Sequence, residues 1–176
     1  MSILKSVFTL TFFTFLTFTL YGQLGDVNEG CATLEVKFQA PSGSTFFWTF
    51  GDGSTSDQRN PTKNYLNAGT YSVEFRNSEG GTIVATDEIK VYDKPTVSFV
   101  GDPQGGCVPL TTNLTDNSTV DPNINITGFR WTFGDGTSAT GNPISHTYNT
   151  PGSFKVSLQL QSDMPGCTVT GEVDDF

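Results

Sequence analysis

The hexapeptide WTFGDG occurs twice in this chain of 176 residues, at residues 48–53 and again at residues 131–136. Each copy lies inside a longer matching segment, residues 46–75 and 129–158. The two segments share, in the same order, the Trp, two Gly flanking an Asp, an Asn-Pro, a Tyr, a Gly and a late aromatic residue. Self-similarity over such a length predicts tandem copies of one structural unit. We therefore predict two homologous domains, residues 23–95 and 96–176, with a boundary near Pro95.

Within each copy, apolar residues alternate with polar ones, as a strand with one buried face requires. About seven such short segments, separated by turns, fit into each 75 to 80 residues, which is typical of a β-sandwich. We predict an all-β chain with two tandem immunoglobulin-like β-sandwich domains. The clearest alternating sets are Phe46, Trp48 and Phe50; Tyr71, Val73 and Phe75; Phe129, Trp131 and Phe133; and Phe154, Val156, Leu158 and Leu160. Two separate late strands are expected in the first copy, at 82–86 and 88–92.

The repeated motif is predicted to be structural rather than catalytic. A Trp and a Phe two residues apart place two large rings on one face, where a domain of this size needs core anchors. The Gly-Asp-Gly that follows permits positive φ beside an Asp whose carboxylate can accept backbone N–H bonds, which is turn chemistry. The residues concerned are Trp48, Phe50, Gly51, Asp52 and Gly53 in the first copy, and Trp131, Phe133, Gly134, Asp135 and Gly136 in the second.

The WTFGDG motif, the Asn-Pro after it, the HTY or NY before a Gly, and the closing GTYSV or GSFKV together resemble the polycystic kidney disease (PKD) domain. They are similar to the tandem repeats of bacterial surface and secreted proteins, and the resemblance covers essentially the whole chain after residue 22. It implies an immunoglobulin-like sandwich that serves as a non-catalytic extracellular spacer, ligand-binding or protein-contact module. It also implies that His146, which precedes Thr-Tyr, packs beside the Trp. The first copy departs from the pattern, because Lys63 or Asn64 stands at the histidine position.

Residues 1–22 have the features of a secretory signal peptide, because Lys5 precedes an uncharged apolar run of about fifteen residues. A membrane anchor is the alternative, but crossing a bilayer takes about 20 apolar residues. We expect cleavage after Gly22, no membrane insertion afterwards, and a secreted or cell-surface location. The whole chain has 9 basic and 18 acidic residues, so loss of Lys5 leaves 8 basic residues and a net charge of −10. Such a surface repels nucleic acid.

Three cysteines in an exported chain predict one disulfide and one remaining thiol. Cys107 opens the second copy and Cys167 lies in its late hairpin, so we expect these two to pair within one domain. Cys31, which aligns with Cys107, would then be unpaired. The alternative is a bond between Cys31 and Cys107 that ties the two domains together.

No catalytic, cofactor-binding or metal site is predicted. Asp52 and Asp135 stand in equivalent corners of separate domains, so they cannot form a carboxylate pair around one substrate. A turn-capping role is expected for both, with a weak calcium site as the alternative, although the acidic residues nearby lack EF-hand spacing. The chain has one histidine and no G-x-S-x-G motif, which argues against hydrolase chemistry.

The stretch 119–128 is longer than its counterpart in the first copy, and loops at the ends of a sandwich often carry binding function. We place a possible ligand loop there, at Asp121, Asn123 and Asn125. The predicted function is a non-catalytic extracellular module for adhesion, protein contact or spacing, whose partner is a protein or carbohydrate at the cell surface. The alternative is a set of accessory repeats that bind the carbohydrate or protein substrate of a secreted hydrolase. The final GEVDDF aligns with DEIKVY of the first copy, and we expect the polypeptide to continue beyond it.

Overall fold

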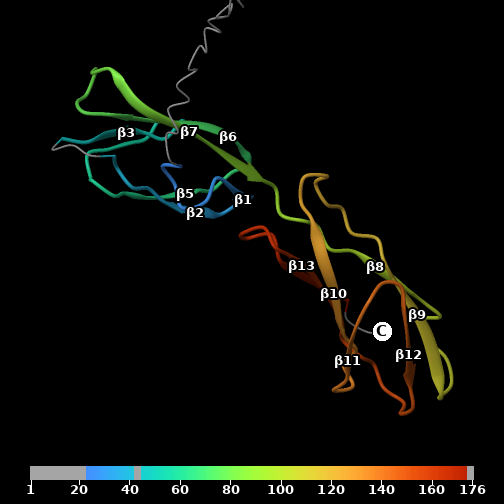
Figure 1. Cartoon of the computed structure of the whole chain (residues 1–176). Coiled ribbons are helices and arrows are strands. Elements are labelled where there is room, and N and C mark those ends of the chain that lie inside the picture. The colour runs from blue at the N-terminus through green and yellow to red at the C-terminus, as the bar shows by residue number, and fades with distance from the viewer. Residues whose placement is uncertain (1–22, 42–44, 174–176) are drawn as a thin grey trace, which may run out of the picture.

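The computed structural model describes residues 23–41 and 45–173. The predicted signal peptide, residues 1–22, lies outside the described residues. All regular structure in the described part is β-strand, arranged as two bodies that lie end to end (Figure 1). We call them module 1 (residues 23–95) and module 2 (residues 96–173). The described residues include no helix long and apolar enough to span a bilayer.

Module 1 consists of two sheets that face each other. The larger sheet has five strands in the order β1 (Glu29–Cys31), β7 (Ile83–Tyr92), β6 (Gly69–Arg76), β3 (Phe47–Thr49) and β4 (Thr55–Ser56). The smaller sheet pairs β2 (Leu34–Lys37) with β5 (Thr62–Tyr65). All pairs are antiparallel except β1 with β7, which is parallel.

Module 2 repeats this plan with a fuller second sheet. Its first sheet has the order β11 (Ser138–Thr140), β10 (Ile126–Thr132), β13 (Val156–Ser162) and β14 (Val169–Val173). Its second sheet has the order β12 (Ile144–Tyr148), β9 (Leu110–Asp116) and β8 (Phe99–Asp102). Every described strand pair of these two sheets is antiparallel.

The strand registers show which residues of the two modules are equivalent. Trp48 lies opposite Phe75, as Trp131 lies opposite Leu158. The same correspondence relates the pair Leu34–Tyr65 to Leu110–Tyr148, and the pair Val73–Asp87 to Val156–Val173. Val173 is therefore equivalent to Asp87. The alignment of GEVDDF with DEIKVY pairs Gly171 with Asp87 instead, so it is shifted by two residues.

Each module buries its own apolar core, as the alternating pattern predicts. The two Trp side chains are fully buried, and so are Val156, Leu158 and Leu160 of β13. Burial of large apolar side chains is the main source of stability in sandwiches of this size. The core of module 1 contains Leu24, Leu34, Val36, Phe38, Ala40, Trp48, Phe50, Tyr65, Val73, Phe75, Ala85, Ile89 and Val91. The core of module 2 contains Phe99, Leu114, Trp131, Phe133, Tyr148, Val156, Leu158 and Leu160.

The prediction of two late strands in module 1 was wrong, because β7 runs without interruption from Ile83 to Tyr92. The polar residues at its centre are not a turn. Asp87 instead accepts hydrogen bonds at one carboxylate oxygen from the backbone N–H groups of Leu24 and Gly25, at 2.9 and 3.2 Å. A charged residue in mid-strand thus fastens the first described residues of the module to its sheet.

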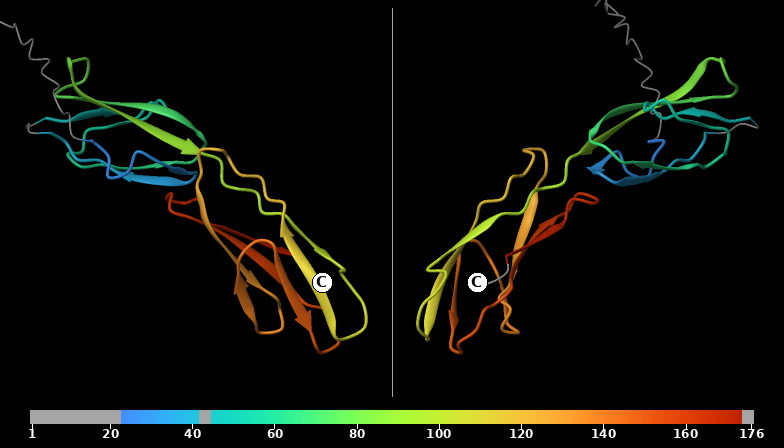
Figure 2. Two further views of the ribbon diagram at one scale, coloured as in Figure 1. Left: turned by 45° about the vertical axis from the view of Figure 1, so that its right-hand side comes forward. Right: turned by 180° about the vertical axis from the view of Figure 1, so that it is seen from behind.

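The connection between the modules is short, and it is tied to module 2. Pro95 is buried, and Thr96 forms an antiparallel bridge with Thr119 through two backbone hydrogen bonds of 3.0 and 2.9 Å. The hairpin between β13 and β14 points back toward β1 and β2 of module 1 (Figure 2). The end of module 2 that faces module 1 is therefore built from the segment 119–126 and this hairpin.

Candidate functional site

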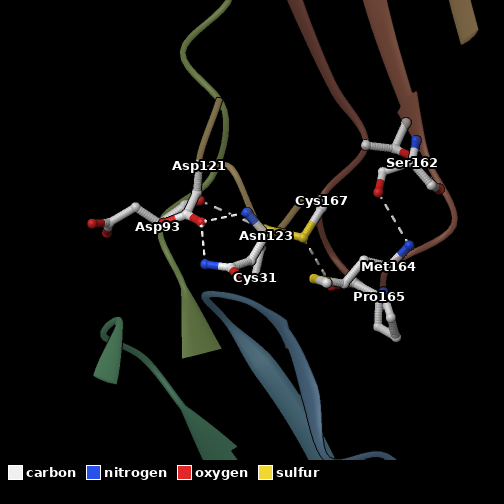
Figure 3. Close-up of a disulfide and its surroundings, with 9 residues drawn as sticks. Cys31, Asp93, Asp121, Asn123, Ser162, Met164, Pro165 and Cys167 are labelled. Carbon is white, nitrogen blue, oxygen red and sulfur yellow. Dashed lines mark hydrogen bonds between the residues drawn. A yellow bond between two sulfur atoms is a disulfide. The ribbon is translucent and has the colours of Figure 1, made fainter. Parts of the chain in front are cut away.

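The feature that distinguishes this chain from two separate sandwiches is a disulfide between the modules. Cys31, at the end of β1, is bonded to Cys167, in the turn between β13 and β14 (Figure 3). The Cα atoms are 5.1 Å apart, although 136 positions separate the two residues in the sequence. Both side chains are fully buried. The bond therefore joins the beginning of module 1 to the end of module 2.

The predicted pairing of Cys107 with Cys167 was wrong, and so was the alternative pairing of Cys31 with Cys107. Cys107 is a free, exposed thiol. The physical reason is the direction of the strands. Cys107 follows β8, which runs away from module 1, whereas Cys167 lies in a hairpin that points toward module 1 (Figure 1). The two cysteines of module 2 are thus at opposite ends of one sandwich.

Two glycines allow the backbones of the modules to approach at this junction. The N–H of Cys31 donates a 2.8 Å hydrogen bond to the Pro165 carbonyl oxygen. A Cβ atom at Gly30 would lie 2.8 Å from that same oxygen, and one at Gly166 would lie 3.0 Å from the Cys31 carbonyl oxygen. Gly166 also has a φ of 74°, in the left-handed region that favours glycine. The close contact between the modules depends on both residues.

The hairpin that carries Cys167 is held in shape by its own hydrogen bonds. The Cys167 N–H donates to the Met164 carbonyl oxygen at 3.2 Å, and the Met164 N–H donates to Ser162 Oγ at 3.1 Å. The Ser162 N–H in turn donates to Thr168 Oγ1 at 3.2 Å. Because these bonds are internal to the hairpin, it presents its cysteine in a defined position.

The predicted ligand loop lies at this junction. Ile124 is buried against the disulfide. One carboxylate oxygen of Asp121 accepts hydrogen bonds from the backbone N–H and the side-chain amide of Asn123, at 2.8 and 2.9 Å (Figure 3). The Asn125 amide lies 3.5 Å from a carboxylate oxygen of Asp163 in the hairpin. The loop therefore covers the disulfide, while Asn123 and Asn125 remain exposed.

A small apolar cluster surrounds the disulfide, and sequence reasoning did not find it. Ile124 is buried with the two cysteines, and four partly buried side chains pack against them: Tyr92, Val120, Ile126 and Met164. The available signal was the pair of isoleucines, Ile124 and Ile126, in the otherwise polar stretch DPNINIT. Exclusion of water from this cluster favours one relative position of the modules.

The repeated Asp residues have the turn-capping geometry that the motif predicts. In module 1, one carboxylate oxygen of Asp52 accepts hydrogen bonds from the N–H and hydroxyl of Ser54, at 3.0 and 2.6 Å. The other oxygen lies 2.6 Å from Lys63 Nζ. Partial burial raises the pKa of Asp52, but the hydrogen bonds from Lys63 and Ser54 outweigh it and hold the pKa at about 2.

The corner of module 2 is the same except for the partner. Asp135 accepts hydrogen bonds from the N–H and hydroxyl of Thr137 at 3.0 and 2.6 Å, and its second oxygen lies 2.8 Å from His146 Nε2. Burial opposes a low pKa for Asp135, yet the hydrogen bonds from Thr137 and His146 lower it. The His146 ring stacks on Phe133, with centroids 3.9 Å apart, and meets Tyr148 edge-on. Its ring partners among the described residues thus do not include Trp131, which the family pattern implied.

Buried hydrogen bonds explain why each module keeps a Trp and a Tyr. The Tyr65 hydroxyl donates to the Phe50 carbonyl oxygen at 3.2 Å, and the Tyr148 hydroxyl donates to the Phe133 carbonyl oxygen at 3.0 Å. Burial raises the pKa of Tyr148 to about 12. The indole N–H groups donate to carbonyl oxygens ten residues downstream, at Gln58 in module 1 and Gly141 in module 2. These bonds tie the core to the corner in each module.

Neither corner has a reactive arrangement. Asp52 and Asp135 lie in different modules, and each is already engaged by hydrogen-bond donors. In the described part of the chain, no group of three or more His, Cys, Asp or Glu side chains is placed to hold a metal ion. In both corners the Asp carboxylate accepts the backbone N–H two residues downstream.

Comparison with known proteins identifies the repeated unit. The sequence profile of the PKD domain matches residues 22–91 and again residues 92–175. The chain belongs to the PKD domain family. The two PKD matches together cover residues 22–175 of this chain.

Individual relatives resemble single PKD modules or the pair. A microbial collagenase of Vibrio alginolyticus is 38% identical over 71 residues, which are 38% of this chain and only 9% of the collagenase. The PKD1 domain of the metalloprotease PrtV from Vibrio cholerae is 25% identical over 46% of this chain and 93% of that domain, with a TM-score of 0.38. The amphioxus IgVJ-C2 molecule is 17% identical over 84% of this chain and 98% of its own, also with a TM-score of 0.38.

Proposed function

We propose that the chain is a non-catalytic extracellular spacer in which two PKD modules are locked end to end, so that it carries tension without lengthening. The observation that supports this proposal is the disulfide between Cys31 and Cys167. An extracellular location is consistent with a buried disulfide, since such bonds persist in oxidising compartments. The signal-like residues 1–22 point the same way.

The position of the disulfide determines the path of an applied force. When the ends of the pair are pulled, tension entering near residue 23 reaches Cys31 after eight residues and passes directly to Cys167. The residues between the two cysteines then bear no load through the backbone. Without the bond, their separation of 136 positions corresponds to about 490 Å of extended chain at roughly 3.6 Å per residue. The bond therefore shields both cores from forced unfolding.

Single-molecule force spectroscopy on residues 23–176, pulled from both ends, tests this function. We expect the oxidised protein to show no unfolding step of the contour length enclosed by the disulfide. Cys31→Ser should release about 490 Å in two steps, one for each module. Cys107→Ser is the matched control and should behave as the native protein. Release of the full length by the oxidised native chain would contradict the proposal.

A second candidate function is substrate contact for a secreted protease. The supporting observation is the 38% identity with a segment of a microbial collagenase. In this function the modules would bind a protein substrate, and the exposed Asn123 and Asn125 of the predicted ligand loop would make the contact. Carbohydrate is the other ligand class for the same loop.

Cosedimentation of residues 23–176 with fibrillar collagen, together with binding to a glycan array, tests the second candidate. We expect Asn123→Ala combined with Asn125→Ala to weaken any binding seen. Asn64→Ala, an exposed Asn in module 1, is the matched control. Binding that the double variant does not change would exclude the loop, and absence of binding to both ligand classes would leave the spacer function alone.

A further inference from the structure

The free thiol of Cys107 occupies the same position in module 2 as the bonded Cys31 in module 1. Each cysteine follows a glycine and stands three residues before a leucine, Leu34 or Leu110. Leu34 pairs with Tyr65, and Leu110 pairs with Tyr148. Yet Cys31 is fully buried, whereas Cys107 is exposed. Equivalent positions in one fold thus have opposite environments.

The surroundings of Cys107 form an apolar cavity of about 360 Å³. We call this the Cys107 face, and define it by its lining residues 104–108, Leu110, Tyr148, 150–152 and Phe154. The equivalent side chains of module 1 are covered. Leu34 is buried, whereas its equivalent Leu110 is only partly buried, and β1 is paired with the last residues of β7. Cys31 itself is covered by the hairpin of module 2.

We infer that the Cys107 face is the docking surface for a further PKD module, and that Cys107 forms a disulfide with the hairpin cysteine of that module. This inference follows from the junction within this chain, where the equivalent cysteine is bonded to the hairpin of the next module. The last strand of module 2, continued into the connection to that further module, pairs beside residues 105–107, as the end of β7 pairs with β1 within module 1. The hairpin of the further module then reaches the thiol.

The glycine before Cys107 fits this occupant. At Gly30 the absence of a side chain admits the Pro165 carbonyl oxygen, which would lie 2.8 Å from a Cβ atom. At Gly106 the single atom near a Cβ position is Cδ1 of Leu110, at the end of a side chain that can move. The space that a hairpin carbonyl fills in module 1 is thus open in module 2.

A second copy of this chain is not the occupant, because its Cys167 is already bonded to its own Cys31. The partner must carry a hairpin cysteine with a free thiol. Bond formation removes two protons and two electrons from the two thiols. A disulfide oxidant accepts them, and it is itself reduced to two thiols.

The test is a three-module chain: residues 23–173, then residues 88–95, then a second copy of residues 96–173. Val173 lies opposite Val156 in module 2, and Asp87 lies opposite the equivalent Val73 in module 1. Joining Val173 to Glu88 therefore continues the strand in register. The chain is refolded with oxidised and reduced glutathione, alkylated and mapped by mass spectrometry after proteolysis. We expect bonds from Cys31 to Cys167 and from Cys107 to Cys167 of the added copy, with Cys107 of the added copy alkylated.

Alkylation of Cys107, or a bond from Cys167 of the added copy to any other cysteine, would overturn the inference. The first junction is an internal control for folding of the native part. A matched control moves the thiol by two residues along the same loop, with Gly105→Cys and Cys107→Ser together. We expect this variant to leave the added hairpin cysteine alkylated. Bond formation in it would show that mere proximity suffices, and would also overturn the inference.

A shorter variant covers the case in which the added module does not fold. Residues 23–173 followed by residues 88–95 supply the connecting strand alone. We expect the alkylation rate of Cys107 to fall about threefold or more relative to the native chain. The reason is that, at the first junction, the Asp93 carbonyl oxygen of this connecting segment lies 3.6 Å from the sulfur of Cys31. An unchanged rate would overturn the inference. The inferred bond at Cys107 rests on the proposed spacer function and adds one junction to it. Disulfide mapping does not measure whether the chain lengthens under force, so the two proposals can fail separately.

Discussion

Modules 1 and 2 share strand order, register and corner geometry, yet their opening cysteines have different fates. Cys31 is buried and bonded across the junction, whereas Cys107 is exposed and free. The local sequences GC at both positions do not explain this. The difference comes from what each module has for a neighbour, since only module 1 is followed by another described module. In a tandem array, the role of a residue is thus decided partly outside its own domain.

Two smaller differences lie within the modules. The corner Asp is paired with Lys63 in module 1 and with His146 in module 2. At the equivalent core position, Val36 in module 1 is replaced by Thr112 in module 2. Both of these side chains are fully buried, and the Thr112 hydroxyl has no hydrogen-bond partner among the described residues. Among the described residues, module 2 therefore buries an unpaired hydroxyl at a position where module 1 has an apolar side chain.

The largest expected effect is loss of the junction disulfide. Cys31→Ser should lower the free energy of unfolding by about 5 kcal/mol, because the bond closes a very long loop. Urea unfolding followed by fluorescence reports on both modules, since each has one Trp. Cys107→Ser should leave the unfolding curve unchanged. Equal losses in the two variants would break the comparison between the two cysteines.

The next effect concerns the exchanged core position. Val36→Thr should destabilise module 1 by about 2 kcal/mol, because a buried hydroxyl without a partner keeps its desolvation cost. The reverse change, Thr112→Val, should stabilise module 2 by about 1 kcal/mol. Thermal unfolding of the two variants gives both values. If Thr112→Val is destabilising, the Thr112 hydroxyl has a hydrogen-bond partner in solution, and the core of module 2 then has no unpaired hydroxyl at this position.

The smallest effect is at the corner. Asp52→Asn should destabilise module 1 by about 1 kcal/mol at neutral pH, through loss of its contacts with Lys63 and Ser54. The folded-state pKa of Asp52, about 2, is below its ordinary value of 3.8. The stabilisation is therefore complete above pH ~4 and is lost as pH falls toward 2.

Urea unfolding at pH 7 and near pH 2 measures this dependence. The difference between Asp52→Asn and the native chain should shrink to a small remainder near pH 2, where the Asp52 carboxylate is half protonated. Asp135→Asn, with His146 as the partner, should show a loss in the same direction in module 2. A difference that persists undiminished near pH 2 would mean that the carboxylate acts through something other than its charge.

Much of the fold follows from short-range patterns. The alternation around Trp48 and Trp131 and the Gly-Asp-Gly turns each depend on residues within a few positions of one another, and the repeat is a match between two sets of such local patterns. Such patterns specify strands, buried faces and corners. The wrong prediction at β7 shows the limit of such patterns. Asp87 in the middle of a strand suggests a turn when only its neighbours in sequence are considered, because the backbone N–H groups that it binds come from more than 60 residues away.

The sequence by itself determined that this chain is two copies of one all-β unit with aromatic cores and capped turns. Only the tertiary structure decided that Cys167 pairs with Cys31, that Ile124 covers that bond, and that Cys107 is left exposed. The reason is that strand direction and the end-to-end placement of the modules decide which cysteines meet. Those long-range relations depend on the packing of the whole chain and have no local signature.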